Sequence, residues 1–276
     1  MADDEDAAVG RHAGNGTPAA DAPHARTGGD VVRFFARGVG QTLITAGLVL
    51  LLFVVYEVWV TNIFAHQKQT QARKQLAQVW SSGKDPLKGQ DKLQLPAGTQ
   101  VVIPLGEGFA NIYIPVLGKD FAFPVVEGTD EADLEKGVGH YTGTAIPGQI
   151  GNFSVAGHRV GKGEPFLNLD HLKPGDAVVI QTASHWYVYK VLGKGTDLAA
   201  TDTQGVPGRE IVTPDQSQVI DPVPGHPGLS PTRALMTMTT CHPKYSATDR
   251  MIVHAALSRA IAKSGKRTPK EMGGDL

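Results

Sequence analysis

The chain is poor in cysteine: among its 276 residues, only Cys241 carries a thiol. A single cysteine cannot form an internal disulfide, and it excludes every zinc site that is built on paired cysteines. A secreted domain held together by disulfide bonds is therefore excluded. The simplest interpretation of a lone thiol is a small buried apolar side chain, because free cysteine is among the most buried residue types.

The chain also lacks an excess of charge of one sign. Its formal net charge is -1 and only 19% of its residues are charged. Binding of nucleic acid needs a clustered basic face, so we predict no nucleic-acid partner. The carboxylates Glu127, Asp130 and Glu131 are interpreted as a solvated face, and we predict no metal site and no cofactor. Hydrophobic residues make up 41% of the chain, which is enough for one domain with appendages.

Long apolar runs are scarce, and the longest spans Leu43 to Tyr56. Apolar residues continue after Glu57, and a helix of about 18 residues rises about 27 Å, close to the ~30 Å hydrocarbon core of a bilayer. We predict a transmembrane helix over residues 39–61, with Tyr56 and Trp59 as interfacial anchors. A cleaved signal peptide is disfavoured because its N-terminal region would be shorter and no clean small-residue cleavage site follows. A buried core helix is disfavoured because the run is apolar all round.

The rest of the N-terminal region and the C-terminus are polar. Residues 1–38 are predicted to be a disordered tail, residues 62–99 a stalk or linker, and residues 263–276 a polar tail. Basic residues flank the span almost equally, with Arg26, Arg33 and Arg37 before it and Lys68, Arg73 and Lys74 after it. The charge balance therefore leaves the orientation of the span open.

Between the linker and the C-terminal tail, short apolar runs alternate with turn signals. Examples are Ala110–Val116, Asn152–Ala156 and Trp186–Val191, which are rich in β-branched and aromatic residues. This pattern is typical of an all-β sandwich or barrel, and we predict such a domain over residues 100–262. Helix is expected only in short pieces, at Asp130–Lys136 and Phe166–His171.

The lone cysteine lies at the end of a β-prone run. Leu235–Cys241 and Arg250–Leu257 flank a loop-like segment. If these runs pair as antiparallel strands, Cys241 and Arg250 lie about 4.5 to 5.5 Å apart. A neighbouring cation favours the thiolate, and a fixed arginine can stabilise an oxyanion. The alternative, a solvated Arg250 beside a packed Cys241, stays equally open at this point.

A cysteine nucleophile also needs a base, and the chain has ten histidines. His242 would point to the opposite face of the strand from Cys241, and His254 would lie roughly 13 Å along the strand from Arg250. His12 and His24 lie in the predicted tail and His66 at the anchor, and nothing argues for or against His171, His185 and His226. His140 and His158 remain. His158 follows an apolar run and opens a glycine-rich loop, where catalytic groups tend to lie. A purely structural role for this histidine remains the alternative.

Several motifs resemble those of the sortases, and within them class E, the type found in high-GC Gram-positive actinobacteria. The family's Thr-Leu-x-Thr-Cys motif is matched by Thr237–Cys241 with Met in place of Leu, and its Ala-Gly-His setting by Ala156-Gly157-His158. Arg250–Val253 and Gly139-His140-Tyr141 also look like class E. The resemblance covers roughly Val101 to Leu257.

The resemblance implies a sortase-type β-barrel of about eight strands with short helices, plus one N-terminal transmembrane helix. It implies a cysteine transpeptidase, a thiol endopeptidase in which Cys241 attacks the Thr–Gly bond of a C-terminal sorting signal and forms a thioester. Class E is associated with Leu-Ala-x-Thr-Gly signals rather than Leu-Pro-x-Thr-Gly. The expected partners are surface proteins that carry such a signal and a peptidoglycan precursor amine as acceptor.

The resemblance also assigns residue roles and an orientation. His158 is expected to be the acid and base, Arg250 the oxyanion stabiliser, Thr240 a hydrogen-bonding group for the oxyanion or substrate, and Tyr141 a residue at the substrate entrance. The protein is expected in the cell membrane as a single-pass protein, with its N-terminus cytoplasmic and its catalytic domain extracellular.

Two other functions fit parts of the pattern. An L,D-transpeptidase is also a β-rich wall enzyme that uses cysteine, but its Ser-His-Gly-Cys signature is absent, because Thr239 and Thr240 precede Cys241. A membrane-tethered β-barrel that binds wall polymers would use Cys241 only for packing. The accessibility of the thiol distinguishes this last alternative.

Overall fold

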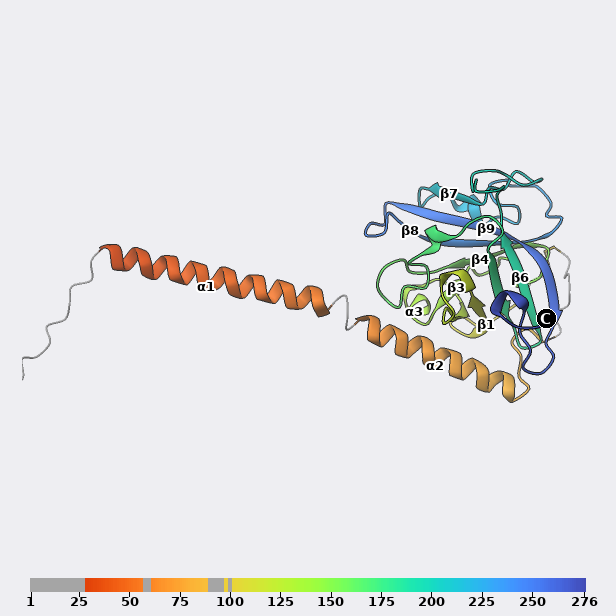
Figure 1. Cartoon of the computed structure of the whole chain (residues 1–276), viewed down its shortest axis with the longest axis horizontal. Coiled ribbons are helices and arrows are strands. Elements are labelled where there is room, and N and C mark those ends of the chain that lie inside the picture. The colour runs from red at the N-terminus through yellow and green to blue at the C-terminus, as the bar shows by residue number, and fades with distance from the viewer. Residues whose placement is uncertain (1–27, 57–60, 89–96, 99–100) are drawn as a thin grey trace, which may run out of the picture. The chain divides into compact units, whose positions relative to one another are not determined.

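The computed structural model describes residues 28–56, 61–88, 97–98 and 101–276 (Figure 1). The chain divides into two units, Met1–Leu52 and Phe53–Leu276. Most of the predicted N-terminal tail, residues 1–27, and the expected interfacial anchor Trp59 lie outside the described residues.

The first helix, α1, spans Gly28–Val55, and its stretch Val32–Val55 is long and apolar enough to cross a membrane. The apolar side chains of this stretch are exposed rather than packed in a core. The helix begins at Gly28, so the prediction of a disordered tail up to residue 38 was wrong for residues 28–38. The physical reason is that Phe34 and Phe35 extend the apolar run, and arginine, which interrupts it, is a good helix former.

In the part of the chain that the structure describes, eight strands close into a barrel. In barrel order they are β6 (His185–Val191), β5 (Ala177–Gln181), β1 (Gly108–Tyr113), β2 (Phe123–Glu127), β3 (Val138–His140), β4 (Gly151–Ala156), β8 (Ala234–His242) and β9 (Asp249–Ala262). The pairing of β6 with β9 closes the ring, and β7 (Arg209–Val212) pairs with the first half of β9 outside it. The predicted all-β barrel of about eight strands is confirmed.

The side chains of β8 alternate between the barrel interior and its outer surface. Met236 and Met238 face the main core together with Val253 of β9. Thr237, Thr239 and Cys241 therefore point outward. Since β4 and β8 are parallel, their C-terminal ends lie at the same rim of the barrel.

Helical pieces within the barrel domain are short, as expected. α3 (Glu131–Leu134) and the 3-10 helix η3 (Leu169–His171) fall within the two predicted stretches. Among the described residues, further 3-10 helices are η2 (Pro115–Leu117), η4 (Ser217–Ile220) and, after the barrel, η5 (Lys270–Met272).

The two segments that flank the barrel in sequence pack against it. α2 (Thr61–Ser81) lies in the region predicted to be a stalk, and it contacts β1 and β2 (Figure 1). Ala65, Gln69 and Leu76 are buried, and their spacing places them on one helix face. In the predicted C-terminal tail, Met272 and Leu276 pack against the cluster around Trp186. Residues on both sides of the predicted domain therefore contribute to its packing.

Candidate active site

The parallel pairing of β4 with β8 brings the segment after β4, which contains His158, to the end of β8 that carries Cys241. Ala156 is the register partner of Thr239, and the N–H of Gly157 donates to the carbonyl of Thr239 at 3.1 Å. His158 and Cys241 each follow two residues later. Both residues therefore lie at the same rim of the barrel, where alternation along β8 places Cys241 on the outer face and His158 is the second residue after β4.

On the other side of β8, Cys241 is the direct register partner of Arg250. The predicted antiparallel pairing of these two runs is confirmed. His158, Cys241 and Arg250 consequently form one line across β4, β8 and β9, which we call the outer row. All three are partly exposed, so the interpretation of Cys241 as a fully buried packing residue is not supported.

The guanidinium of Arg250 is held by the loop that precedes it. Its Nη1 donates to the carbonyl of Ala247 at 2.9 Å and to that of Asp249 at 3.0 Å. These two bonds restrain one of the three nitrogens of the planar group. The side chain is therefore pre-oriented rather than loosely solvated.

Tyr141 lies on the same face as the outer row. It continues from β3, and its hydroxyl hydrogen-bonds to the Thr239 hydroxyl at 2.9 Å. The ring reaches this partner across β4, where the small side chain of Ala156 lies between the two strands. Tyr141 is thus placed at the edge of the outer row, two residues along β8 from Cys241.

Thr240 lies on the opposite face from Cys241. It is 3% exposed, and its hydroxyl donates to the carbonyl of Gly157 at 2.8 Å. This bond uses the hydroxyl proton that would be needed to stabilise an oxyanion. The structure therefore places Thr240 as a link between β8 and the residue before His158, rather than in the outer row.

The structure also separates the other candidate histidines from the outer row. His140 is buried next to Glu127, with 2.6 Å between Nδ1 and Oε2, and its Nε2 lies 2.9 Å from the Thr144 hydroxyl. Its register partner is Val155, which belongs to the main core, so His140 faces the interior. Of the two histidines that the sequence left open, His158 is the one that follows β4 at the rim where β8 carries Cys241.

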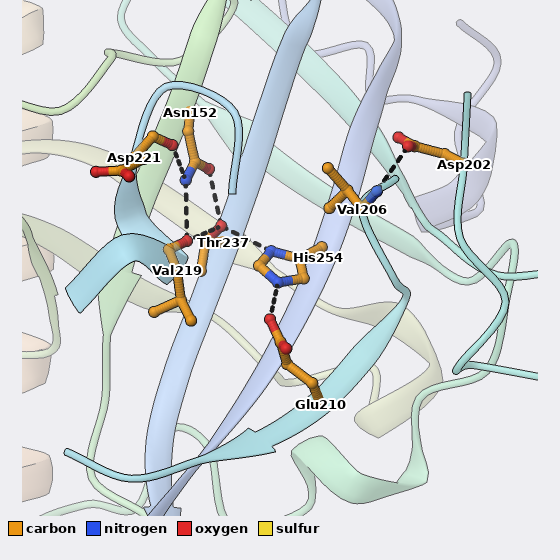
Figure 2. A network of polar contacts seen from close by, with 8 residues as sticks. All are labelled: Asn152, Asp202, Val206, Glu210, Val219, Asp221, Thr237 and His254. Atoms are coloured by element: carbon orange, nitrogen blue, oxygen red, sulfur yellow. Dashed lines mark hydrogen bonds and ion pairs between the residues drawn. The ribbon is translucent and has the colours of Figure 1, made fainter. Parts of the chain in front are cut away.

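His254 belongs to a hydrogen-bonded network on the outer face (Figure 2). Its Nδ1 lies 2.9 Å from the Thr237 hydroxyl, which donates to Asn152, and its Nε2 lies 3.2 Å from Glu210. Asn152 in turn donates to the carbonyl of Asp221 at 3.0 Å. The network joins β4, β8, β9 and β7 and anchors the segment around η4 to the sheet. His254 is fully buried in it and is not in contact with solvent.

Arg159 is a residue of the site that the sequence interpretation missed. It is 4% exposed, and its Nη1 lies 3.2 Å from the carbonyl of Cys241 and 2.9 Å from Nδ1 of His242. Because a guanidinium has only donors, Nδ1 of His242 is the acceptor. Arg159 thereby fixes the backbone of the proposed nucleophile. Its only sequence signal is its place directly after His158.

Asp170 completes this support. Its Oδ1 lies 3.3 Å from Nη2 of Arg159. Burial raises the pKa of Asp170, but a backbone hydrogen bond and the charges of Arg159 and Lys244 outweigh it, so the pKa lies below its ordinary value. The carboxylate therefore stays ionised as the counter-ion of the buried arginine.

Known proteins resemble this chain in sequence and in fold. The family described as the sortase domain matches residues 112–258. Sortase SrtE1 of Streptomyces coelicolor is 35% identical over 225 residues, which are 79% of this chain and 56% of SrtE1. The chain belongs to the sortase family. Sortase SrtE2 of the same organism is 32% identical over 84% of this chain and 85% of its own length.

Solved structures place this sortase near class E. Sortase E from Streptomyces avermitilis is 36% identical, with a TM-score of 0.51 over 61% of this chain and 99% of that one. The SrtF sortase from Corynebacterium diphtheriae is 39% identical, with a TM-score of 0.56 over 64% of this chain and 97% of that one. The relatives support the class E resemblance. The chain spans little more than half the length of SrtE1.

Burial lowers the pKa of His158 in this sortase below its ordinary value of 6.5, and the negative charge of Glu135 partly opposes the shift. Among the residues that the structure describes, Nε2 of His158 is buried and has no hydrogen-bond partner. An imidazole with a lowered pKa is a stronger acid when it is protonated, and it is mostly neutral at pH 7.

We expect NMR titration to give His158 a midpoint below 6.5, with its resonance assigned by its loss in His158→Asn. Glu135→Gln should lower the midpoint further, because the carboxylate favours the imidazolium. Glu271→Gln, which removes a carboxylate bound to Arg259, is the control and should leave it unchanged. Because the folded-state pKa is lowered, this histidine's contribution to stability is present above pH 6.5 and is lost as the pH falls through the folded-state pKa. A midpoint at or above 6.5 would contradict the desolvated environment.

Proposed function

We propose that the protein is a membrane-anchored cysteine transpeptidase in which Cys241 is the nucleophile, His158 the general acid and base, and Arg250 the oxyanion stabiliser. The observation that supports the proposal is the outer row: Cys241 and Arg250 are register partners, and His158 comes two residues after the β4 residue that pairs with Thr239. The proposed substrate is a surface protein with a C-terminal sorting signal of the Leu-Ala-x-Thr-Gly or Leu-Pro-x-Thr-Gly type.

In the first step the Cys241 thiolate attacks the threonine carbonyl of the Thr–Gly bond. The negative charge that develops on the carbonyl oxygen is stabilised by the guanidinium of Arg250, which the loop carbonyls hold in place. The C–N bond breaks as the His158 imidazolium gives its proton to the leaving glycine amine. The products are a thioester on Cys241 and the released C-terminal peptide.

In the second step an amine of a cell-wall precursor attacks the thioester. Neutral His158 takes the proton of the incoming amine, the C–S bond breaks, and the thiolate of Cys241 is restored. The lowered pKa of His158 suits both steps, since it makes the imidazolium a ready proton donor and returns it easily to the neutral base. The surface protein is then joined to the wall by an amide bond.

Two further residues are proposed to support these steps. Tyr141 borders the outer row and would contact the signal peptide at the entrance, where its hydroxyl is fixed by Thr239. Thr240 would act as a positioning residue through its bond to the carbonyl of Gly157, directly before His158.

For the arrangement in the cell we propose that α1 crosses the membrane once, with the N-terminal tail in the cytoplasm and the barrel outside. The apolar stretch Val32–Val55 supports the membrane anchor. The proposed orientation of this helix is supported by the family, because sortases are cell-surface enzymes. We keep residues 100–262 as the proposed catalytic domain. Helix α2 and residues 263–276 pack against it.

The experiment uses the full chain in detergent with quenched fluorescent peptides that contain Leu-Ala-x-Thr-Gly or Leu-Pro-x-Thr-Gly. We expect cleavage only between Thr and Gly, and a new amide product in mass spectra when a glycine-based amine is added. We also expect the thiol to react with a methanethiosulfonate reagent in the folded protein. A folded protein with an inert thiol and no cleavage of either peptide would support the wall-binding alternative.

A further inference from the structure

The loop that follows His158 contains four consecutive residues in the left-handed backbone region. Their φ values are 73° for Gly161, 53° for Lys162, 82° for Gly163 and 49° for Glu164. Two of the four carry side chains, for which this region is disfavoured. Such a turn persists only where its surroundings hold it in place.

Helix α2 supplies part of that support. Gln69 is 4% exposed, and its Nε2 donates to the carbonyl of Lys162 at 3.2 Å. The Gln69 amide also lies so close to Gly163 that a Cβ at this glycine would clash with it. The amide of Gln69 therefore fits against the backbone of the left-handed turn.

Two ion pairs hold the same region from α3. Lys162 pairs with Glu131 at the start of α3, and Lys68, the neighbour of Gln69, pairs with Glu135 directly after α3. These pairs are partly exposed and contribute little individually. Together with the buried Gln69, they tie α2, α3 and the turn into one connected group.

The turn is coupled to His158 through short backbone contacts. The N–H of Phe166 donates to the carbonyl of His158 at 3.0 Å, and the N–H of Glu164 donates to the carbonyl of Gly161 at 3.1 Å. The Phe166 ring lies against Gly157, where a Cβ would clash with it. A change in the turn would therefore move the backbone on both sides of His158.

We propose that α2 is a positioning element of the active site and that Gln69 is its positioning residue, because it holds the left-handed turn that sets the place of His158. The inference rests on the proposed function, in which His158 transfers protons. It gives the segment between the membrane helix and the barrel a part in catalysis beyond that of a linker. A misplacement of about 1 Å in a catalytic group can cost up to about a hundredfold in rate.

The test compares Gln69→Met with Gln71→Met in the full chain. Both make the same chemical change on the same helix, but Gln71 is exposed. We expect Gln69→Met to lower kcat on the order of tenfold with little change in KM, and Gln71→Met to behave like the parent chain. Hydrogen exchange of the amides in residues 159–167 should become faster in Gln69→Met alone, while the amides of β8 and β9 keep their protection.

A second variant tests the contact independently of Gln69→Met. Gly163→Ala should lower kcat, and in the Gln69→Ala background it should lower kcat by a smaller factor, because the clash with the amide is gone. Equal kcat and equal loop exchange in Gln69→Met and Gln71→Met would overturn the inference. A parent chain that cleaves no peptide would instead overturn the proposed function, and the exchange data would still decide whether Gln69 holds the turn.

Discussion

Replacing Cys241 with alanine is expected to abolish cleavage of the signal peptide, with kcat/KM reduced by at least about 10⁴-fold. The reaction proposed here passes through a thioester, and no other residue of the chain carries a thiol. The thioester itself should be visible in intact-mass spectra of the parent chain that is quenched with acid during turnover. The same mass increase should be absent in Cys241→Ala.

The control for this prediction is Ser246→Ala, which alters an exposed residue of the loop between β8 and β9 without touching the thiol. It should retain both the thioester and turnover. Unfolding temperatures of the two variants should match that of the parent chain, because Cys241 is only partly buried. Cleavage by folded Cys241→Ala would remove the nucleophile assignment.

His158→Ala should also abolish turnover of the signal peptide. If His158→Ala kept its activity, the base role would belong to another histidine.

The pairing of Cys241 with Arg250 was predictable because it is local in sequence. Two β-prone runs separated by a short polar segment favour an antiparallel hairpin, and the register then follows from the length of the loop. The all-β class was predictable for the same reason, since each strand carries its own β-branched and aromatic residues. The parallel neighbour of β8 is different, because β4 lies more than seventy residues earlier.

The faces of the strands were harder to predict. His140 and Tyr141 are adjacent, yet one faces the core beside Glu127 and the other borders the outer row. Polar residues on both faces hide the alternation that normally shows which side is buried. The roles of Arg159 and Thr240 depend on bonds across more than eighty residues, which a single sequence does not reveal.

The packing of α2 was missed for a related reason. The helix is polar overall, and its buried face is carried by Ala65, Leu76 and an amide, Gln69. Such a face has too few large apolar residues to stand out from a solvated helix. The burial of Gln69 becomes understandable only when the unusual backbone of the turn at Gly161–Glu164 is known, since that turn presents the carbonyl of Lys162 to it.

Arg250→Lys is expected to lower kcat about 10²- to 10³-fold with a small change in KM, which is the size of effect seen when a preorganised oxyanion donor is lost. Lysine keeps the positive charge, but it lacks the planar group that the carbonyls of Ala247 and Asp249 hold in one orientation. Comparison with Arg250→Ala separates charge from geometry. If charge alone matters, lysine should retain most of the activity and only alanine should lose it.

The matched control is Arg259→Lys on the same strand. The guanidinium of Arg259 pairs with Glu271 and not with the carbonyls of Ala247 and Asp249. It should leave kcat unchanged. Full turnover in Arg250→Lys would show that a positive charge at this position is sufficient and that the held orientation of the guanidinium is not needed.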